Sequence, residues 1–160
     1  MRRCCLWLLL SAIAGAAHAA ETSSAAALVL PPVATVAVGK KGPFAGVDTR
    51  KSAERFDTAA HRRLVAAFDA KLGGKTLPAD VVLGLLSNAK VTAKNVSTPE
   101  ALKTVATTAK VEWLVAFSFG KGNTLTAQIH DAQGAPVGDA YVLTRASNGL
   151  NDAQAKEVAE

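Results

Sequence analysis

The sequence predicts an α/β domain of the α+β kind: a mixed sheet with a C-terminal antiparallel three-stranded meander, packed by two to three helices. Three observations lead to this prediction. Apolar residues recur every four positions over residues 56–72, the period of a helix buried on one side. They alternate along three segments between residues 113 and 143, the period of strands. A short apolar run over residues 27–30 stops at two prolines and indicates a buried strand.

The first 19 residues have the three parts of a secretory signal peptide. Arg2 and Arg3 supply the positive start, residues 6–13 the apolar centre, and Ala17 and Ala19 an A-x-A cleavage motif before Ala20. The apolar stretch of about a dozen residues is shorter than the ~20 that a spanning helix needs. We therefore expect cleavage and export through the Sec route to the periplasm, or secretion, in a Gram-negative bacterium. Arg2-Arg3 leaves a twin-arginine leader as the alternative.

Composition excludes several classes of chemistry from the mature chain. Both cysteines, Cys4 and Cys5, fall inside the leader, so the rest of the chain has no disulfide, thiol nucleophile or thiolate metal site. They also precede the apolar centre, whereas a lipoprotein needs its cysteine after it. Removing Arg2 and Arg3 takes the formal charge from +5 to +3, without any basic run interleaved with aromatics. We expect no nucleic-acid partner and no cofactor.

The first half of the mature chain contains two expected strands and a long helix. Residues 20–26 are a flexible segment rich in Ser and Ala, and residues 27–146 form one domain. Residues 33–38 extend the first strand or form a second one, and the glycine-rich residues 39–49 are a loop. The helix over 56–72 ends at Gly73-Gly74, where glycine accepts a left-handed conformation.

The second half contains two further helices and then the meander. Residues 81–86 follow Pro78 and favour a short helix. Ser97 and Glu100 form a capping-box pattern before a helix whose buried face carries Leu102, Val105, Ala106 and Ala109. Strands are expected over 113–119, with both faces apolar, over 124–130, with Leu125, Ala127 and Ile129 buried, and around 141–143. Residues 147–160 are a short helix capped by Asn151, or a truncated tail, with almost no apolar face.

This order of elements resembles the N-terminal domain of TolB and its relatives CsgG and LpoB, a bacterial envelope module. The resemblance covers residues 27–145. It rests on the strand ending in Leu30-Pro31, the 56–72 helix, the 113–119 strand and the Asp-Ala-x-Gly turn at 131–134. Ala109-Lys110-Val111 replaces the family's Gly-Ala pair, and the C-terminal helix is shorter than the family's. The resemblance implies an envelope role but supplies no catalytic residue.

Candidate catalytic groups are few. His130, Asp131 and Ser118 are the first suspects for a hydrolase, but adjacent strand residues point to opposite faces, which favours a solvated edge histidine over a His–Asp pair. His61 lies on the long helix, beside its charged residues. No motif for zinc appears, and the glycine-lysine turns at 39–42 and 120–122 lack the P-loop pattern. We therefore expect no catalytic, cofactor-binding or metal-binding residues.

Two functions of different classes follow. The first is an exported envelope accessory or binding module without catalytic activity, which contacts an envelope protein or a peptidoglycan-associated partner and has no membrane span after cleavage. The second is a small periplasmic hydrolase with a non-obvious site. A third possibility is that the chain is the N-terminal fragment of a longer envelope protein.

Overall fold

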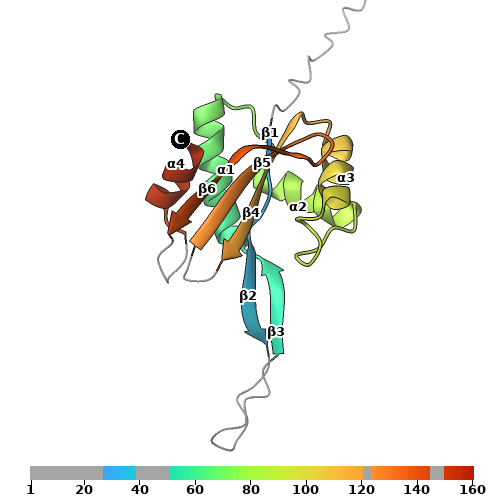
Figure 1. The fold of residues 1–160 in the computed structure, drawn as a ribbon, viewed down its shortest axis with the longest axis vertical. Helices are drawn as coiled ribbons and strands as arrows, with labels where there is room; N and C mark the ends of the chain where they lie inside the picture. Colours follow the sequence, from blue (N-terminus) through green and yellow to red (C-terminus); the bar gives the residue numbers. More distant parts are fainter. Residues whose placement is uncertain (1–26, 39–50, 121–123, 145–149) are drawn as a thin grey trace, which may run out of the picture.

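The computed structural model describes residues 27–38, 51–120, 124–144 and 150–160, which form six strands and four helices (Figure 1). The expected leader with Ala17, Ala19 and Ala20, the flexible segment 20–26, the loop 39–49 and the centre of the turn at 120–123 lie outside the described residues. The elements are β1 (Ala27–Val29), β2 (Val33–Val38), β3 (Lys51–Phe56), α1 (Thr58–Leu72), α2 (Ala79–Asn88), α3 (Pro99–Ala109), β4 (Trp113–Gly120), β5 (Thr124–Asp131), β6 (Pro136–Thr144) and α4 (Asp152–Ala159).

Four strands form the main sheet, in the order β1-β4-β5-β6. The short strand β1 runs parallel to β4, and β4, β5 and β6 form an antiparallel meander. Figure 1 shows α1 and α4 on one side of this sheet and α2 and α3 on the other. The predicted fold class is confirmed: the sheet is mixed, it ends in the meander, and helices pack on both of its faces.

Two hydrophobic clusters fill the spaces between sheet and helices, because successive residues of a strand point to opposite faces. Leu28 and Leu114 pack with α2 and α3, whereas Val29 and Val115 pack with α1 and α4. Both faces of β1 and β4 are thus buried, as the unbroken apolar runs predict. The α2/α3 face and the α1/α4 face are the names used below for the two sides of the sheet.

A separate two-stranded ribbon, β2–β3, projects from the body of the domain (Figure 1). Residues 33–38 are a second strand and not an extension of β1. Their partner β3 was not predicted, and Phe56, expected in the long helix, pairs with Val33 at the end of β3. The helix α1 begins only after Asp57, whose Oδ1 accepts the backbone N–H of Ala60 at 3.0 Å. Phe56 fitted the four-residue spacing but packs against the α2/α3 cluster from the ribbon.

Most predicted helix ends are close to the observed ones. Gly73 adopts the left-handed conformation and closes α1, and α2 starts directly after Pro78. The cap of α3 is Thr98, not Ser97: the Thr98 hydroxyl accepts the N–H of Ala101 at 3.3 Å. Pro99 then occupies the first helical position, where its missing N–H costs nothing.

The C-terminal helix α4 is capped as predicted but is better packed than its sequence suggested. Asn151 and Gln154 form a reciprocal capping box. Leu150, Ala155 and Val158 are buried in the α1/α4 cluster, so the helix docks on the domain itself. The expectation of almost no apolar face was wrong. Leu150, which precedes the helix, the small residue Ala155 and Val158 are enough to fill the contact with α1.

Candidate functional site

His130 and Asp131 both serve the turn that joins β5 to β6. The carboxylate of Asp131 accepts the backbone N–H groups of Gln133 and Ala135, each at 2.9 Å. The ring Nδ1 of His130 lies 3.1 Å from the carbonyl oxygen of Gly134. Both side chains therefore hold the turn in shape and do not contact each other as a base and its orienting acid would.

Ser118 lies far from these two residues along the sheet. In the register of β4 and β5, Ser118 faces Thr126, while His130 faces Leu114. Four residues of strand separate the two positions, which is about 13 Å. The expectation of an edge position for His130 was wrong, because β5 is an interior strand between β4 and β6. The structure does not assemble the proposed hydrolase residues into a site.

His61 is the one described polar or charged residue that is buried, with 0% of its surface exposed. Its Nε2 lies 2.8 Å from the carbonyl oxygen of Val29, and its Nδ1 has no hydrogen-bond partner among the described residues. Burial lowers the pKa of His61 below its usual 6.5, and the bond to Val29 only partly opposes this effect. Sequence analysis missed this burial, although the spacing of three from Leu64 placed both residues on one helical face.

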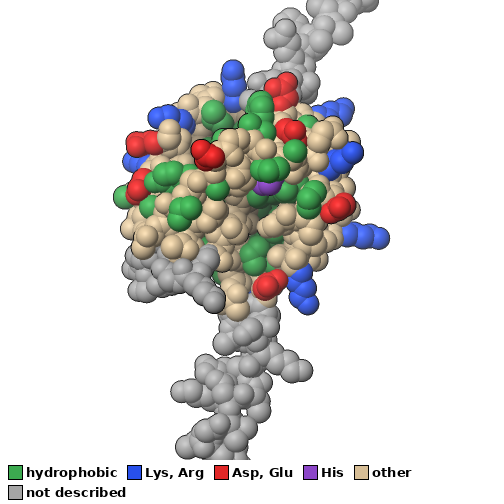
Figure 2. All heavy atoms as spheres, viewed as in Figure 1, with side chains coloured by type: hydrophobic (Ala, Val, Ile, Leu, Met, Phe, Trp, Pro, Cys, Tyr) green, Lys and Arg blue, Asp and Glu red, His purple; other side chains and the backbone are tan. Residues whose placement is uncertain are grey.

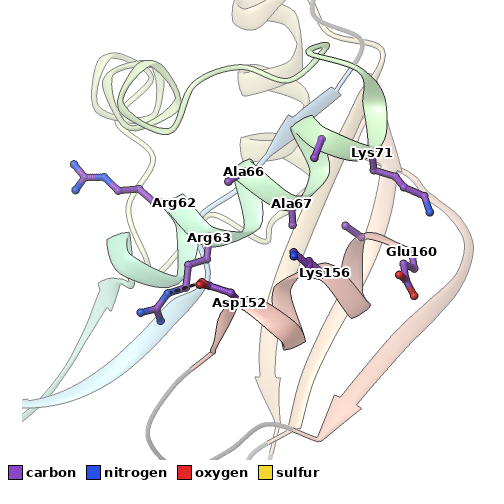
Figure 3. A pocket seen from close by; sticks show the side chains of 10 residues that line it. Arg62, Arg63, Ala66, Ala67, Lys71, Asp152, Lys156 and Glu160 are labelled. Carbon is purple, nitrogen blue, oxygen red and sulfur yellow. Dashed lines mark ion pairs between the residues drawn. The ribbon is translucent and has the colours of Figure 1, made fainter.

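Metal chemistry finds no support in the described parts of the chain, where no three His, Cys, Asp or Glu side chains come together. A groove of about 610 Å³ lies between α1 and α4 (Figure 3). Alanines form its floor, and charged side chains surround it. The lining residues are Arg62, Arg63, Ala66, Ala67, Ala70, Lys71, Asp152, Lys156, Ala159 and Glu160.

Two arginines at this groove link α1 to neighbouring helices. Arg63 bonds the carbonyl oxygen of Leu150 and pairs with Asp152 at 3.2 Å, so it fastens the start of α4 to α1. Arg62 points away from the groove in Figure 3 and pairs with Asp80 of α2 at 3.2 Å. The groove therefore offers an apolar floor but no convergent set of reactive groups.

The most unusual surface of the domain is a strip of four exposed apolar side chains on the α1/α4 face, which we call the apolar strip. It comprises Trp113, Ile129, Val137 and Tyr141, exposed to 42%, 46%, 39% and 42%. Ile129 pairs with Val137 and also with Val115, two residues from Trp113, while Tyr141 pairs with Ala127, two residues from Ile129. These pairings put all four residues on one face of three adjacent strands.

The strip is exposed because α1 and α4 cover only part of the face. Its neighbours Val115, Phe117, Ala127 and Leu143 on the same face are all buried. The prediction that Ile129 is buried was therefore wrong, although its alternation within the strand was read correctly. An irregularity in β6 also separates Val137 from Tyr141: three residues of β6, including Gly138 at φ +70°, lie opposite Gln128. The Gln128 side chain donates to the carbonyl oxygens of Val137 and Gly138.

Acidic side chains border the apolar strip. Glu112 precedes Trp113 in the chain, and Asp131 lies opposite Trp113 in the sheet. Asp139 lies between Val137 and Tyr141 in β6, and the Tyr141 hydroxyl donates to Glu157 at 3.0 Å. This hydrogen bond to a carboxylate raises the pKa of Tyr141 above its usual 10.0. The carboxylates of Asp131 and Glu157 thus lie beside the strip, at Trp113 and Tyr141.

The opposite face of β4–β6 is also partly exposed. Ser118 and Val142 are exposed there and Thr126 and Gln128 are partly exposed, because α2 and α3 pack over the β1 side of the sheet. Figure 2 shows Lys and Arg side chains toward the outline of the molecule and mainly uncharged surface in the middle of the view.

Comparisons of the chain with protein-family models, with curated proteins and with solved structures found no match. The resemblance to the TolB N-terminal domain remains a prediction. None of the helices in the described ranges combines the length and the apolar character that crossing a bilayer requires. The function must therefore be argued from the chain's own surface.

Proposed function

We propose that this protein is an exported, non-enzymatic module of the Gram-negative cell envelope that binds a protein partner through the apolar strip. One observation carries the proposal. Trp113 and Tyr141 are the only Trp and Tyr after residue 7, and both lie exposed on the same face of the sheet. Trp and Tyr bury a large area with few rotatable bonds, and they dominate the binding energy of protein interfaces.

The surroundings of the strip specify the chemistry of the partner. An exposed apolar surface with two aromatic side chains fits an apolar protein patch, and the carboxylates of Asp131 and Glu157 beside it fit lysine or arginine around that patch. We therefore expect a protein surface with an apolar centre and a basic rim. Binding to such a partner weakens as salt is added, because the charged border is exposed to solvent.

Export rests on the leader. Residues 1–19 have the charge, the apolar centre and the A-x-A site of a cleaved signal peptide, and the chain after them has no cysteine. The resemblance to the TolB N-terminal domain points to the same compartment. Together these features support a place in the periplasm, where the domain contacts an envelope protein or a peptidoglycan-associated protein.

Site-specific crosslinking in the native envelope tests the proposal. A photo-crosslinking amino acid at Val137 should yield one dominant protein adduct. The same group at Val81 of α2, which is exposed to 48% but lies outside the strip, should yield none. Equal adducts at both sites, or no protein adduct at Val137, would contradict the strip as the docking surface. Retention of the protein by purified peptidoglycan, unchanged by Val137→Ser, would instead assign it to the cell wall.

The crosslinked partner then provides a quantitative test. Its complex with the purified protein should weaken by about tenfold or more on Val137→Ser, and should be unchanged by Val81→Ser. These two substitutions remove similar side chains from similarly exposed positions. A difference between them therefore reports the location and not the loss of a valine.

A further inference from the structure

His61 occupies a position where only its neutral form fits. The carbonyl oxygen of Val29 can only accept a hydrogen bond, so the Nε2 atom 2.8 Å away carries the hydrogen. The Nδ1 atom then holds a bare lone pair, and no described group lies within hydrogen-bond reach of it. Protonation would create a second N–H at Nδ1 that points into an apolar environment without an acceptor. Burying an unpaired charged donor in this way is costly.

The charged groups around His61 offer little compensation. Arg62 of α1 disfavours protonation and Asp80 of α2 favours it, but these two side chains already pair with each other. Asp57, one turn earlier in α1, uses its side chain on the N–H of Ala60 and its carbonyl oxygen on the N–H of His61. β1 contributes only Ala27, Leu28 and Val29, and the facing residues of β4 in this cluster are Val115 and Phe117, so neither strand supplies a titratable side chain.

We propose that His61 is an acid-sensitive latch that holds α1 on β1 and releases it when the imidazole is protonated. The ring lies where α1 meets the sheet, and its bond to Val29 is a direct polar link between the two elements. α4 depends on the same link, because Arg63 of α1 holds Leu150 and Asp152. α3 packs on the other face, so it keeps its contacts when the latch opens, whereas α2 loses the ion pair between Asp80 and Arg62 of α1.

Opening extends the surface that binds partners. α1 and α4 cover Val115, Phe117 and Ala127, which lie on the same strands and face as the apolar strip. Their release would enlarge the exposed apolar area continuously from Trp113 toward the centre of the sheet. The latch itself stands on the geometry of His61 and does not depend on the proposed function.

The direction of the pH effect follows from linkage. The pKa of His61 is lowered in the folded protein, so the open form binds a proton that the closed form does not. The full stability of the latch is present above the ordinary value of 6.5 and is lost as the pH falls below it. Between 6.5 and the lowered value the opening equilibrium rises about tenfold per pH unit, and it levels off below that range.

Hydrogen exchange on the purified protein tests the latch between pH 7.5 and 4.5. Protection factors, corrected for intrinsic exchange rates, should fall by up to tenfold per pH unit in α1 and α4 and remain constant in α3. His61→Gln retains an amide donor toward Val29 but does not titrate, so its α1 protection should be independent of pH. His130→Gln is the matched control and should behave like the wild-type protein.

Two results would overturn the proposal: equal pH dependence in α1 and α3, or the same pH dependence with and without His61. An NMR titration of the wild-type histidine ring signals covers the case in which His61→Gln does not fold. The His61 signal should titrate below pH 6.5, together with the loss of α1 protection. A His61 that titrates at or above 6.5, or independently of α1, refutes the latch.

Discussion

Among Gly73, Gly74, Gly84, Gly134 and Gly138, Gly134 in the turn between β5 and β6 is the one whose replacement should cost most. It has φ +80°, and an added Cβ would lie 2.6 Å from the carbonyl oxygen of Pro99 and 3.3 Å from Cβ of Leu102. The Pro99 oxygen is backbone at the start of α3, so it cannot move aside as a flexible side chain would. Gly138 in β6 has a similar φ of +70°, but nothing lies within 4 Å of its added Cβ.

The two glycines therefore form a matched pair. Gly138→Ala should lower the free energy of unfolding by about 1 kcal/mol. The left-handed conformation disfavours alanine by roughly 1–2 kcal/mol, and the lower conformational entropy of the unfolded alanine variant offsets part of this penalty. Gly134→Ala carries the same penalty plus the contact with Pro99, which adds about 1–3 kcal/mol as overpacking. Only the added contact distinguishes the two substitutions.

Urea unfolding followed by far-ultraviolet circular dichroism measures the difference, with a constant m value confirming that only stability has changed. In thermal unfolding Gly134→Ala should melt below Gly138→Ala by about 4 °C for each kcal/mol. Unfolding free energies of the two variants within about 0.5 kcal/mol of each other would show that the turn moves freely relative to α3. The turn that contains Asp131 and Gly134 would then not be packed tightly against α3.

Three further predictions concern the cap, the C-terminal helix and the strip. Thr98→Ala should destabilise the protein by about 1 kcal/mol in urea unfolding, whereas Ser97→Ala should have little effect. A larger effect of Ser97→Ala would show that Ser97 and not Thr98 caps α3. Arg63→Met should speed exchange of the α4 amides about fivefold, corresponding to roughly 1 kcal/mol of lost hydrogen bonding to Leu150, and unchanged α4 exchange would disprove that attachment. Trp113→Ala should leave the melting temperature within about 3 °C of wild type, because Trp113 is 42% exposed and belongs to neither hydrophobic cluster. It should weaken partner binding at least tenfold in calorimetry, and undiminished affinity would remove Trp113 from the interface.

Local periodicity accounted for most of the fold. The alternation from Trp113 to Leu143 identified β4, β5 and β6. Every second residue of a strand lies on the same face of the sheet, so a buried face requires an apolar residue at every second position. The four-residue spacing identified α1, but it could not exclude Phe56, because a single apolar residue at the right spacing satisfies the helical pattern even when it lies in β3. The strand β3 itself, Lys51–Phe56, has no alternation of apolar and polar residues, so its sequence provided no signal for a strand.

The candidate site could not be predicted in the same way. The alternation in the strand predicted that Ile129 is buried, and its exposure, like that of Trp113, Val137 and Tyr141, depends on how far α1 and α4 reach across the sheet. That reach is set by contacts between residues far apart in the chain. Similarly, the separation of Ser118 from His130 follows from strand register, which residue types alone do not specify.

The sequence by itself therefore determined which segments become the helices and the strands of the main sheet, where the glycine turns lie and which chemistries the absence of thiols excludes, because each depends on the residue types and their spacing. Only the tertiary structure decided which polar groups meet and which apolar groups stay exposed. His61 shows the physical reason: its burial needs the carbonyl of Val29, 32 positions earlier in the chain, to lie directly above α1. Such an encounter depends on packing across the whole domain.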